Sequence, residues 1–168
     1  MQATSPARDV ALLGKNATQR PLRETLLLKE FINQMEITLA EIQVLVDRLA
    51  EKINAPFHLL PSYGHTRDGA YPHIEISDKG YHYVVVERGE ELERFVTESL
   101  NELLFKVFRS VTFSMACDFE LKNRIETQDF RRQLFMKQIE LMTQLNEEWG
   151  QKIEIEKLLI LKTHPFSD

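Results

Sequence analysis

The chain has 168 residues, of which 43% are hydrophobic and 28% are charged, as is usual for one globular domain with a substantial core. Its net charge of −5 argues against a nucleic-acid binder, and its single cysteine, Cys117, excludes an internal disulfide framework and a cysteine-based zinc site. No apolar run approaches the roughly 20 residues that span a bilayer, and the first residues lack the pattern of a secretory signal, so we expect a cytoplasmic protein.

Residues 1–34 differ from the rest of the chain. Residues 1–21 have no sustained hydrophobic period and are expected to be poorly ordered, whereas 22–34 are compatible with a peripheral helix. Residues 35–168 carry 16 basic and 23 acidic side chains, a net charge of −7 that suits a basic partner or serves solubility alone. A helix start follows Met35 closely, so we predict an N-terminal extension over 1–34 and a single domain over 35–168.

The first half of this domain predicts one helix and a small sheet. Thr38 and Glu41 have the spacing of a capping box, and the apolar stripe after them ends near Pro56. A loop over 56–71 leads to three strands at about 71–76, 81–87 and 91–97, joined by tight turns at 77–80 and 88–90. On the central strand we expect the face of Val84 and Val86 to pack on the helices and the face of Tyr81 and Tyr83 to be partly open.

The second half predicts helices. Ser99 and Glu102 form a second capping-box pattern before a long, broadly apolar helix that reaches Phe119. After a break near 123–128, one helix runs to about Leu145, and a last one follows Asn146, whose side chain is a good N-cap. The predicted fold is α+β, a three-stranded antiparallel meander packed against a bundle of about four helices.

Few residues offer catalytic chemistry. His73 and His82 fall on neighbouring strands and could bind a metal with Glu75, which is the basis of an alternative reading as a small metal-dependent hydrolase. Cys117 lies within the most apolar helix, where a thiol behaves as a core residue. A group of charges surrounds the junction of the two apolar helices and predicts a structural ion-pair network, with a partner-contacting patch as the alternative: Asp118, Glu120, Arg124, Asp129, Arg131 and Arg132. We predict no catalytic residue, no cofactor and no metal.

Several segments in order resemble the immunity protein 63 family of bacterial polymorphic toxin systems. The segments are Leu60-Pro61-Ser62-Tyr63, Asp68-Gly69 with Pro72-His73-Ile74-Glu75, Gly80-Tyr81-His82-Tyr83-Val84-Val85-Val86-Glu87-Arg88-Gly89, Glu102-Leu103-Leu104, Val111-Thr112-Phe113, Asp129-Phe130-Arg131-Arg132 with Phe135, Trp149, and His164-Pro165-Phe166. The resemblance covers about 36–168.

The resemblance implies a small cytoplasmic protein that binds and blocks a cognate toxin, as in contact-dependent inhibition, and it supplies no catalytic residues. Many such toxins are nucleases and basic, which fits the acidic domain. We therefore expect stoichiometric inhibition through an acidic, partly aromatic surface, with the candidate contacts Tyr63, Tyr81, Glu90, Glu91 and Glu93. A structural dimerisation module that uses the open tyrosine face or an edge strand is the second alternative, and the sequence leaves the oligomeric state open.

Overall fold

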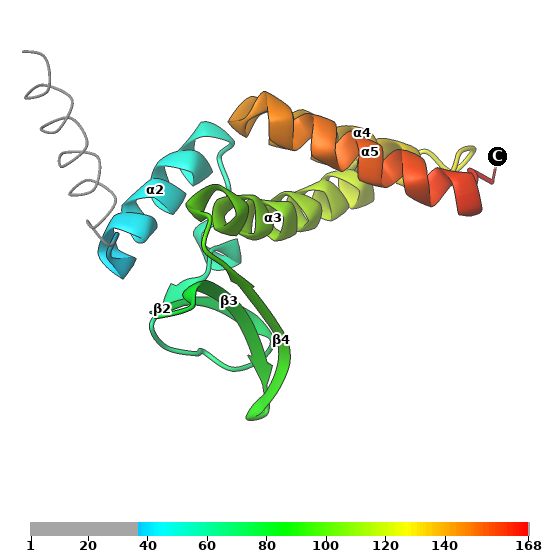
Figure 1. Ribbon diagram of the computed structural model, residues 1–168. Helices are drawn as coiled ribbons and strands as arrows, with labels where there is room; N and C mark the ends of the chain where they lie inside the picture. Colours follow the sequence, from blue (N-terminus) through cyan, green and yellow to red (C-terminus); the bar gives the residue numbers. More distant parts are fainter. Residues whose placement is uncertain (1–36, 168) are drawn as a thin grey trace, which may run out of the picture. The chain divides into compact units, whose positions relative to one another are not determined.

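The computed structural model describes residues 37–167, so the predictions for residues 1–34 lie outside the described part of the chain. Residues Thr38–Asp168 form one compact unit, which contains four α-helices, one short 3-10 helix and one four-stranded sheet (Figure 1). Their bounds are α2 Leu39–Lys52, η1 Phe57–Leu59, β1 Ser62–Tyr63, β2 Tyr71–Ser77, β3 Gly80–Glu87, β4 Glu90–Thr97, α3 Leu100–Lys122, α4 Arg131–Leu145 and α5 Glu147–Thr163.

The α+β class and the meander β2–β3–β4 are confirmed, but the sheet has a fourth strand. The strand order is β1-β2-β3-β4, and β1 pairs with β2 in parallel, whereas the other two pairings are antiparallel. The prediction of three strands missed β1 because it has only two residues, Ser62 and Tyr63, too few for any hydrophobic period. The N–H of Gly64 donates to the carbonyl of Ile74 at 2.8 Å and extends this pairing by one bond.

Local signals explain where the helices begin. At α2, Thr38 and Glu41 form the predicted capping box, and at α5 the Asn146 Oδ1 accepts the N–H of Trp149 at 3.2 Å. At α3 the Ser99 hydroxyl accepts from the N–H of Glu102, but the Glu102 carboxylate accepts from the Thr97 hydroxyl at 2.7 Å. The second predicted capping box is therefore only half formed.

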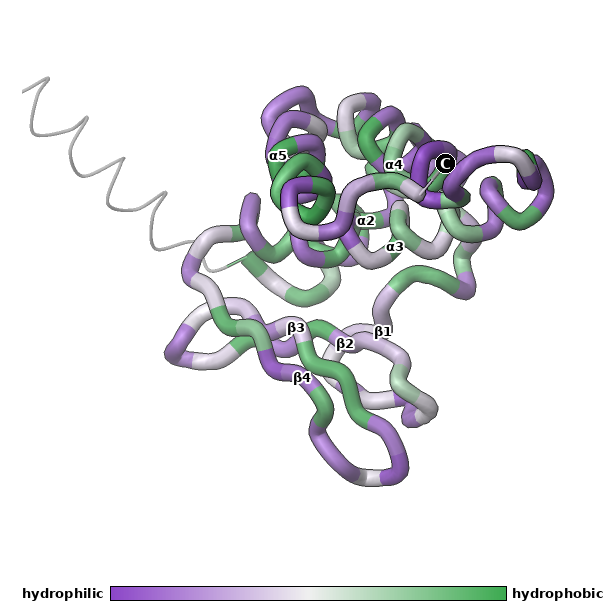
Figure 2. Tube along the Cα trace, turned by 90° about the vertical axis from the view of Figure 1, so that its right-hand side faces the viewer, coloured by the Kyte–Doolittle hydropathy of each residue, from purple (hydrophilic) through white to green (hydrophobic). Residues whose placement is uncertain are grey.

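The helices share a core that reaches the sheet. The largest fully buried side chains include Ile42 of α2, Ile74 of β2, Phe108 of α3 and Met142 of α4. Trp149 of α5 joins the helices by stacking near Phe108, with ring centroids 6.3 Å apart. Figure 1 shows α3 between the sheet and the pair α4–α5, and Figure 2 shows hydrophobic residues on the elements that meet there.

The orientation of the central strand is opposite to the prediction. Tyr83 is 3% exposed, and the Lys106 Nζ of α3 lies 5.1 Å from the centroid of its ring. Lys106 also pairs with Glu93, which lies on the same face of the sheet. The tyrosine face therefore packs on α3, and the prediction that Val84 and Val86 face the helices is wrong. Both faces of β3 carry bulky side chains, so the alternation of side chains along the strand did not indicate which face meets the helices.

Candidate functional site

The hairpin of β3 and β4 projects from the sheet and ends in a two-residue turn, Arg88-Gly89. Both turn residues have positive φ, 52° and 79°, which is the geometry of the tight hairpin turns that match the twist of their strands. At the other end of β3, Gly80 has φ 100°, and a Cβ there would lie 2.5 Å from the Thr97 carbonyl oxygen. Glycine at position 80 therefore allows the start of β3 to approach the end of β4.

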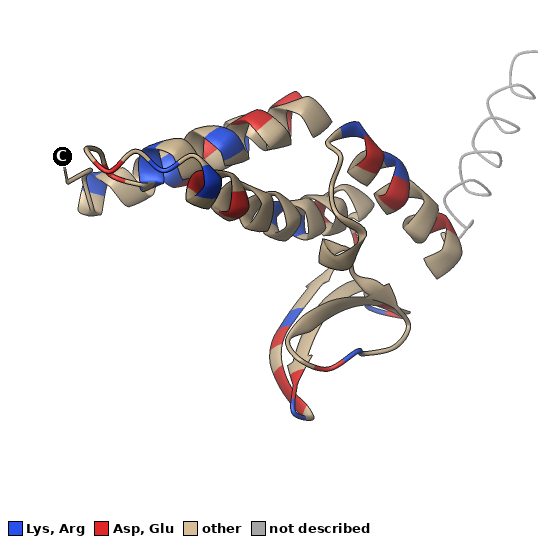
Figure 3. Cartoon of the chain, turned by 180° about the vertical axis from the view of Figure 1, so that it is seen from behind, with Lys and Arg blue, Asp and Glu red and all other residues tan. Residues whose placement is uncertain are grey.

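The strand β4 is the acidic edge of the sheet. Among the described strands it pairs with β3 only, and Glu90, Glu91 and Glu93 are all exposed on it (Figure 3). A bulge near Val85 and Val86 places Glu91 opposite Val86 and Glu93 opposite Val85. Glu91 and Glu93 therefore lie on opposite faces of the sheet, although only one residue separates them in the sequence.

A polar network centred on Arg94 covers the face of the sheet away from α3. The Arg94 guanidinium donates to Glu91, with contacts of 2.6–3.0 Å, and to Glu75 Oε2 at 2.8 Å. It also donates to His82 Nδ1 at 3.0 Å, and Glu75 Oε1 lies 2.9 Å from His73 Nε2. The hydrogen bonds from Arg94 hold the pKa of the Glu91 carboxyl and that of the Glu75 carboxyl below their ordinary values.

The roles of the His82 nitrogens follow from this network. Because a guanidinium only donates, His82 Nδ1 must accept, and the imidazole carries its proton on Nε2. That N–H donates to the Ser77 hydroxyl at 2.7 Å. These two hydrogen bonds hold the His82 ring in one orientation beneath Arg94.

The structure brings His73, His82 and Glu75 together, as the metal-site alternative requires, but the cation among them is Arg94. Its guanidinium bonds to both Glu75 and His82, which uses the oxygen and nitrogen atoms that a metal ion would need. Among the described residues, 37–167, no group of three or more His, Cys, Asp or Glu side chains is arranged to hold a metal. The geometry gives the hydrolase alternative no support.

The five predicted contact residues do not lie together. Glu90, Glu91 and Glu93 share β4, and Tyr81 lies at the start of β3, half-buried and opposite Thr97. Tyr63 lies on β1, and its hydroxyl is buried with no hydrogen-bond partner among the described residues. Burial, with a smaller effect of the Asp47 carboxylate, raises the pKa of Tyr63 well above its ordinary value of 10.0. The Tyr63 hydroxyl thus lies in the interior near α2, whereas the residue as a whole is half-buried.

One pair that the sequence analysis did not single out is Glu87 and Glu90. They are directly opposite each other where the hairpin turns, and neither has a hydrogen bond or an ion pair among the described residues. Like charges at directly opposite positions destabilise a sheet. The signal was present in the sequence, since a two-residue turn at Arg88-Gly89 makes residues 87 and 90 neighbours across the strands.

The second charged cluster contains ion pairs of the kind that the sequence predicted, although Asp118 has none among the described residues. Arg124 binds Glu120 through two bonds of 2.8 Å at the end of α3, and the Asp129 carboxylate accepts from Arg131 just before α4. Arg131 also donates to the carbonyls of His164 and Pro165, at 2.9 and 2.8 Å. The bonds from Arg131 fasten His164 and Pro165 to the start of α4, which is a structural role.

Comparisons with known proteins support the family resemblance over part of the chain. The sequence model of the family described as "Immunity protein 63" matches residues 77–158, which run from the end of β2 into α5. No curated protein and no solved structure matches the chain significantly. None of the described helices is long and apolar enough to cross a membrane. Residues 77–158, which include the acidic hairpin, α3, α4 and most of α5, are thus similar to the immunity protein 63 family, in agreement with the motifs noted in the sequence.

Proposed function

We propose that this chain is an immunity protein that binds a cognate bacterial toxin in a stoichiometric complex and blocks it without catalysis. The family match over residues 77–158 supports the immunity role. The acidic balance of the domain supports a basic toxin, such as a nuclease, because opposite charges speed association.

The observation that carries the choice of surface is the unpartnered acidic pair at the tip of the hairpin. Glu87 and Glu90 are neighbours across the turn, and keeping two like charges there costs stability. A fold tolerates such a local conflict most readily where it serves binding. A basic side chain of the toxin, placed between the two carboxylates, would remove the repulsion and would form two charge-assisted hydrogen bonds.

The neighbouring acids contribute less. Glu91 is bound to Arg94 and Glu93 to Lys106, so their charges are largely compensated within the protein. We propose that these two residues shape the hairpin and its negative electrostatic field, and that Glu87 and Glu90 make the direct contact. Tyr81, half-buried at the far end of β3, is proposed as a flanking contact only.

The test uses the cognate toxin, which we expect a neighbouring gene to encode. The variant Glu90→Lys, and the triple variant with lysine also at positions 91 and 93, should lose protection when expressed with the toxin. Association should slow by at least tenfold at low salt, since charge steering acts mainly on the association rate. The matched control is Glu126→Lys, the same charge change at an exposed position between α3 and α4.

Two results would contradict the proposal. If the triple variant binds the toxin as tightly as wild type, the hairpin is not the interface. If toxin activity falls to zero well below one equivalent of this protein, the inhibition is catalytic rather than stoichiometric. A titration that ends at one equivalent supports a binding inhibitor.

A further inference from the structure

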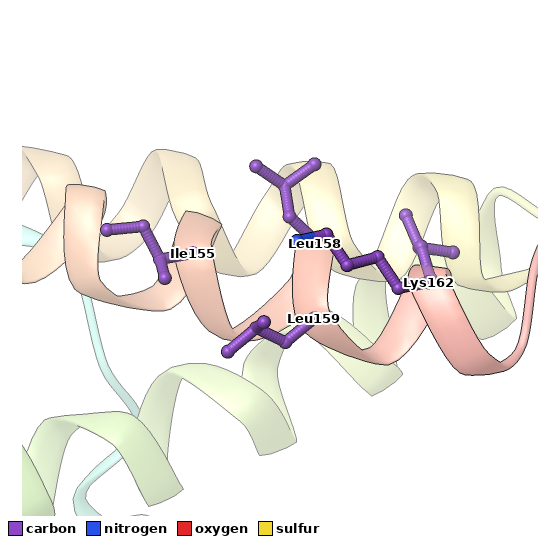
Figure 4. Close-up of a pocket in the computed structure, with 5 residues that line it drawn as sticks. Ile155, Leu158, Leu159 and Lys162 are labelled. Carbon is purple, nitrogen blue, oxygen red and sulfur yellow. The ribbon is translucent and has the colours of Figure 1, made fainter.

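The outer face of α5 carries an apolar ridge that no described element covers. Ile155 is 58% exposed, Leu158 54% and Leu159 55%. With Leu161 and Lys162 they line a shallow hollow of about 430 Å³, and Figure 4 shows the Lys162 side chain running back along the helix toward Leu158. Contiguous exposed apolar side chains on a folded protein indicate an interaction surface.

Glu148 and Lys162 lie on this ridge at equal distances on either side of Ile155. Glu148, Ile155 and Lys162 are spaced seven residues apart, which places them on one face of the helix about 10.5 Å from one to the next. Glu148 and Lys162 are both exposed, and neither has an ion pair or hydrogen bond within residues 37–167. The face therefore runs from acidic through apolar to basic.

We propose that this face binds a second copy of the same chain, with the two α5 helices antiparallel and a two-fold axis beside Ile155. In that arrangement a residue that precedes Ile155 on one helix lies level with the residue that follows Ile155 by the same number of positions on the partner helix. Each Lys162 then meets the Glu148 of the other copy, and the two Ile155 side chains meet on the axis. The apolar ridge supplies the burial, and the charges set the direction.

Other arrangements of the two helices lose this complementarity. A parallel pair places Glu148 beside Glu148 and Lys162 beside Lys162, which is repulsive. A steep crossing separates residues that are 10 Å from the axis, so the helices must cross at the shallow angle of about 20° common in helical bundles. The pattern thus selects one direction and one class of crossing.

Charge-swap variants of the full chain test the direction. Wild type should show a dimer whose fraction rises with concentration in analytical ultracentrifugation. Glu148→Lys and Lys162→Glu should each weaken the dimer at least tenfold, and the double swap should restore it to within about threefold. Ile155→Arg should give a monomer with unchanged circular dichroism, whereas Leu92→Arg, equally exposed at 58% but on β4, should leave the dimer intact.

Cross-linking tests the axis. In a Cys117→Ser background, Ile155→Cys should form an intermolecular disulfide on mild oxidation, because its copy lies across the axis within the range of a disulfide. Gln151→Cys should not, since its copy is displaced by about 12 Å along the helices.

Three results would overturn the proposal: a wild-type monomer at every concentration, a double swap no better than the single ones, or equal cross-linking at both positions. Loss of toxin binding by Ile155→Arg without any change in mass would assign the ridge to the toxin instead and would equally overturn it.

Discussion

Replacing Gly150 by alanine tests a close approach between α4 and α5. A Cβ at position 150 would lie 2.0 Å from the Thr143 Oγ1 and 2.9 Å from both the Cα and the Cβ of Thr143. The hydroxyl could rotate only by giving up its 2.8 Å bond to the Ile139 carbonyl, and the Cα cannot move without its helix. The two helices would have to separate by close to an ångström.

The two effects of this substitution on the free energy of unfolding have opposite signs. Alanine inside a helix is favoured over glycine by about 1 kcal/mol. Overpacking typically costs about 1–3 kcal/mol, and a clash with backbone belongs at the upper end of that range. We therefore expect Gly150→Ala to destabilise the protein by about 2 kcal/mol and to lower Tm by about 4–8 °C.

Urea unfolding followed by circular dichroism measures this, with Gln151→Ala on the same helix as the control for helix propensity. Adding Thr143→Ala removes the shortest contact but leaves the Cα and Cβ contacts, so the double variant should recover part of the loss, with a coupling of at least about 0.5 kcal/mol. A Gly150→Ala protein more stable than wild type would refute the close approach, and strictly additive variants would refute the role of Thr143.

Two further predictions concern charged groups. Arg94→Gln should raise the pKa of Glu91 and that of Glu75 toward their ordinary value of 4.5, because the guanidinium that lowers both is gone; NMR titration measures this, and unchanged values would disprove the network. Asp129→Asn keeps the helix start but loses the ion pair with Arg131, which lowers the pKa of Asp129 below its ordinary value of 3.8. The pKa of Asp129 is lower in the folded state than in the unfolded state. The free energy of unfolding of wild type should therefore exceed that of the variant by its full amount above about pH 5, and this difference should shrink as the pH falls below 4. A difference that stays constant from pH 7 to pH 3 would contradict the ion pair.

Much of the fold could be predicted because local signals were strong. Capping residues such as Thr38 and Asn146 marked the helix starts, and the predicted tight turns separated the strands of the meander. The register of β3 and β4 was not predicted, because the second turn contains only Arg88 and Gly89 and a bulge follows near Val85 and Val86. The strand β1 could not be predicted, since two residues carry no period and its pairing depends on β2 beyond a loop. The face of β3 was assigned wrongly because Val84, at 0% exposure, is buried just as Tyr83 is, on the opposite side.

The candidate site was harder to predict than the fold. The sequence placed Glu91 and Glu93 on the acidic edge, but it could not show that Arg94 and Lys106 compensate them. Lys106 lies on α3, and it reaches Glu93 of β4 because α3 packs on the tyrosine face of the sheet. Side-chain pairing across elements depends on tertiary geometry, which short-range periodicity does not contain.

The two proposed surfaces use different elements and different chemistry. The hairpin tip presents the negative charges of Glu87 and Glu90, which suits a basic partner whose association is accelerated by electrostatic attraction. The ridge of α5 presents Ile155 and its neighbours. Association driven by burial of apolar side chains depends little on salt, which suits a stable complex between copies. Figure 1 shows the hairpin tip pointing away from α4 and α5, so a dimer formed through α5 leaves each hairpin free. The proposed dimerisation and the proposed toxin binding therefore use different residues, and variants in one surface can be used as folded controls for the other.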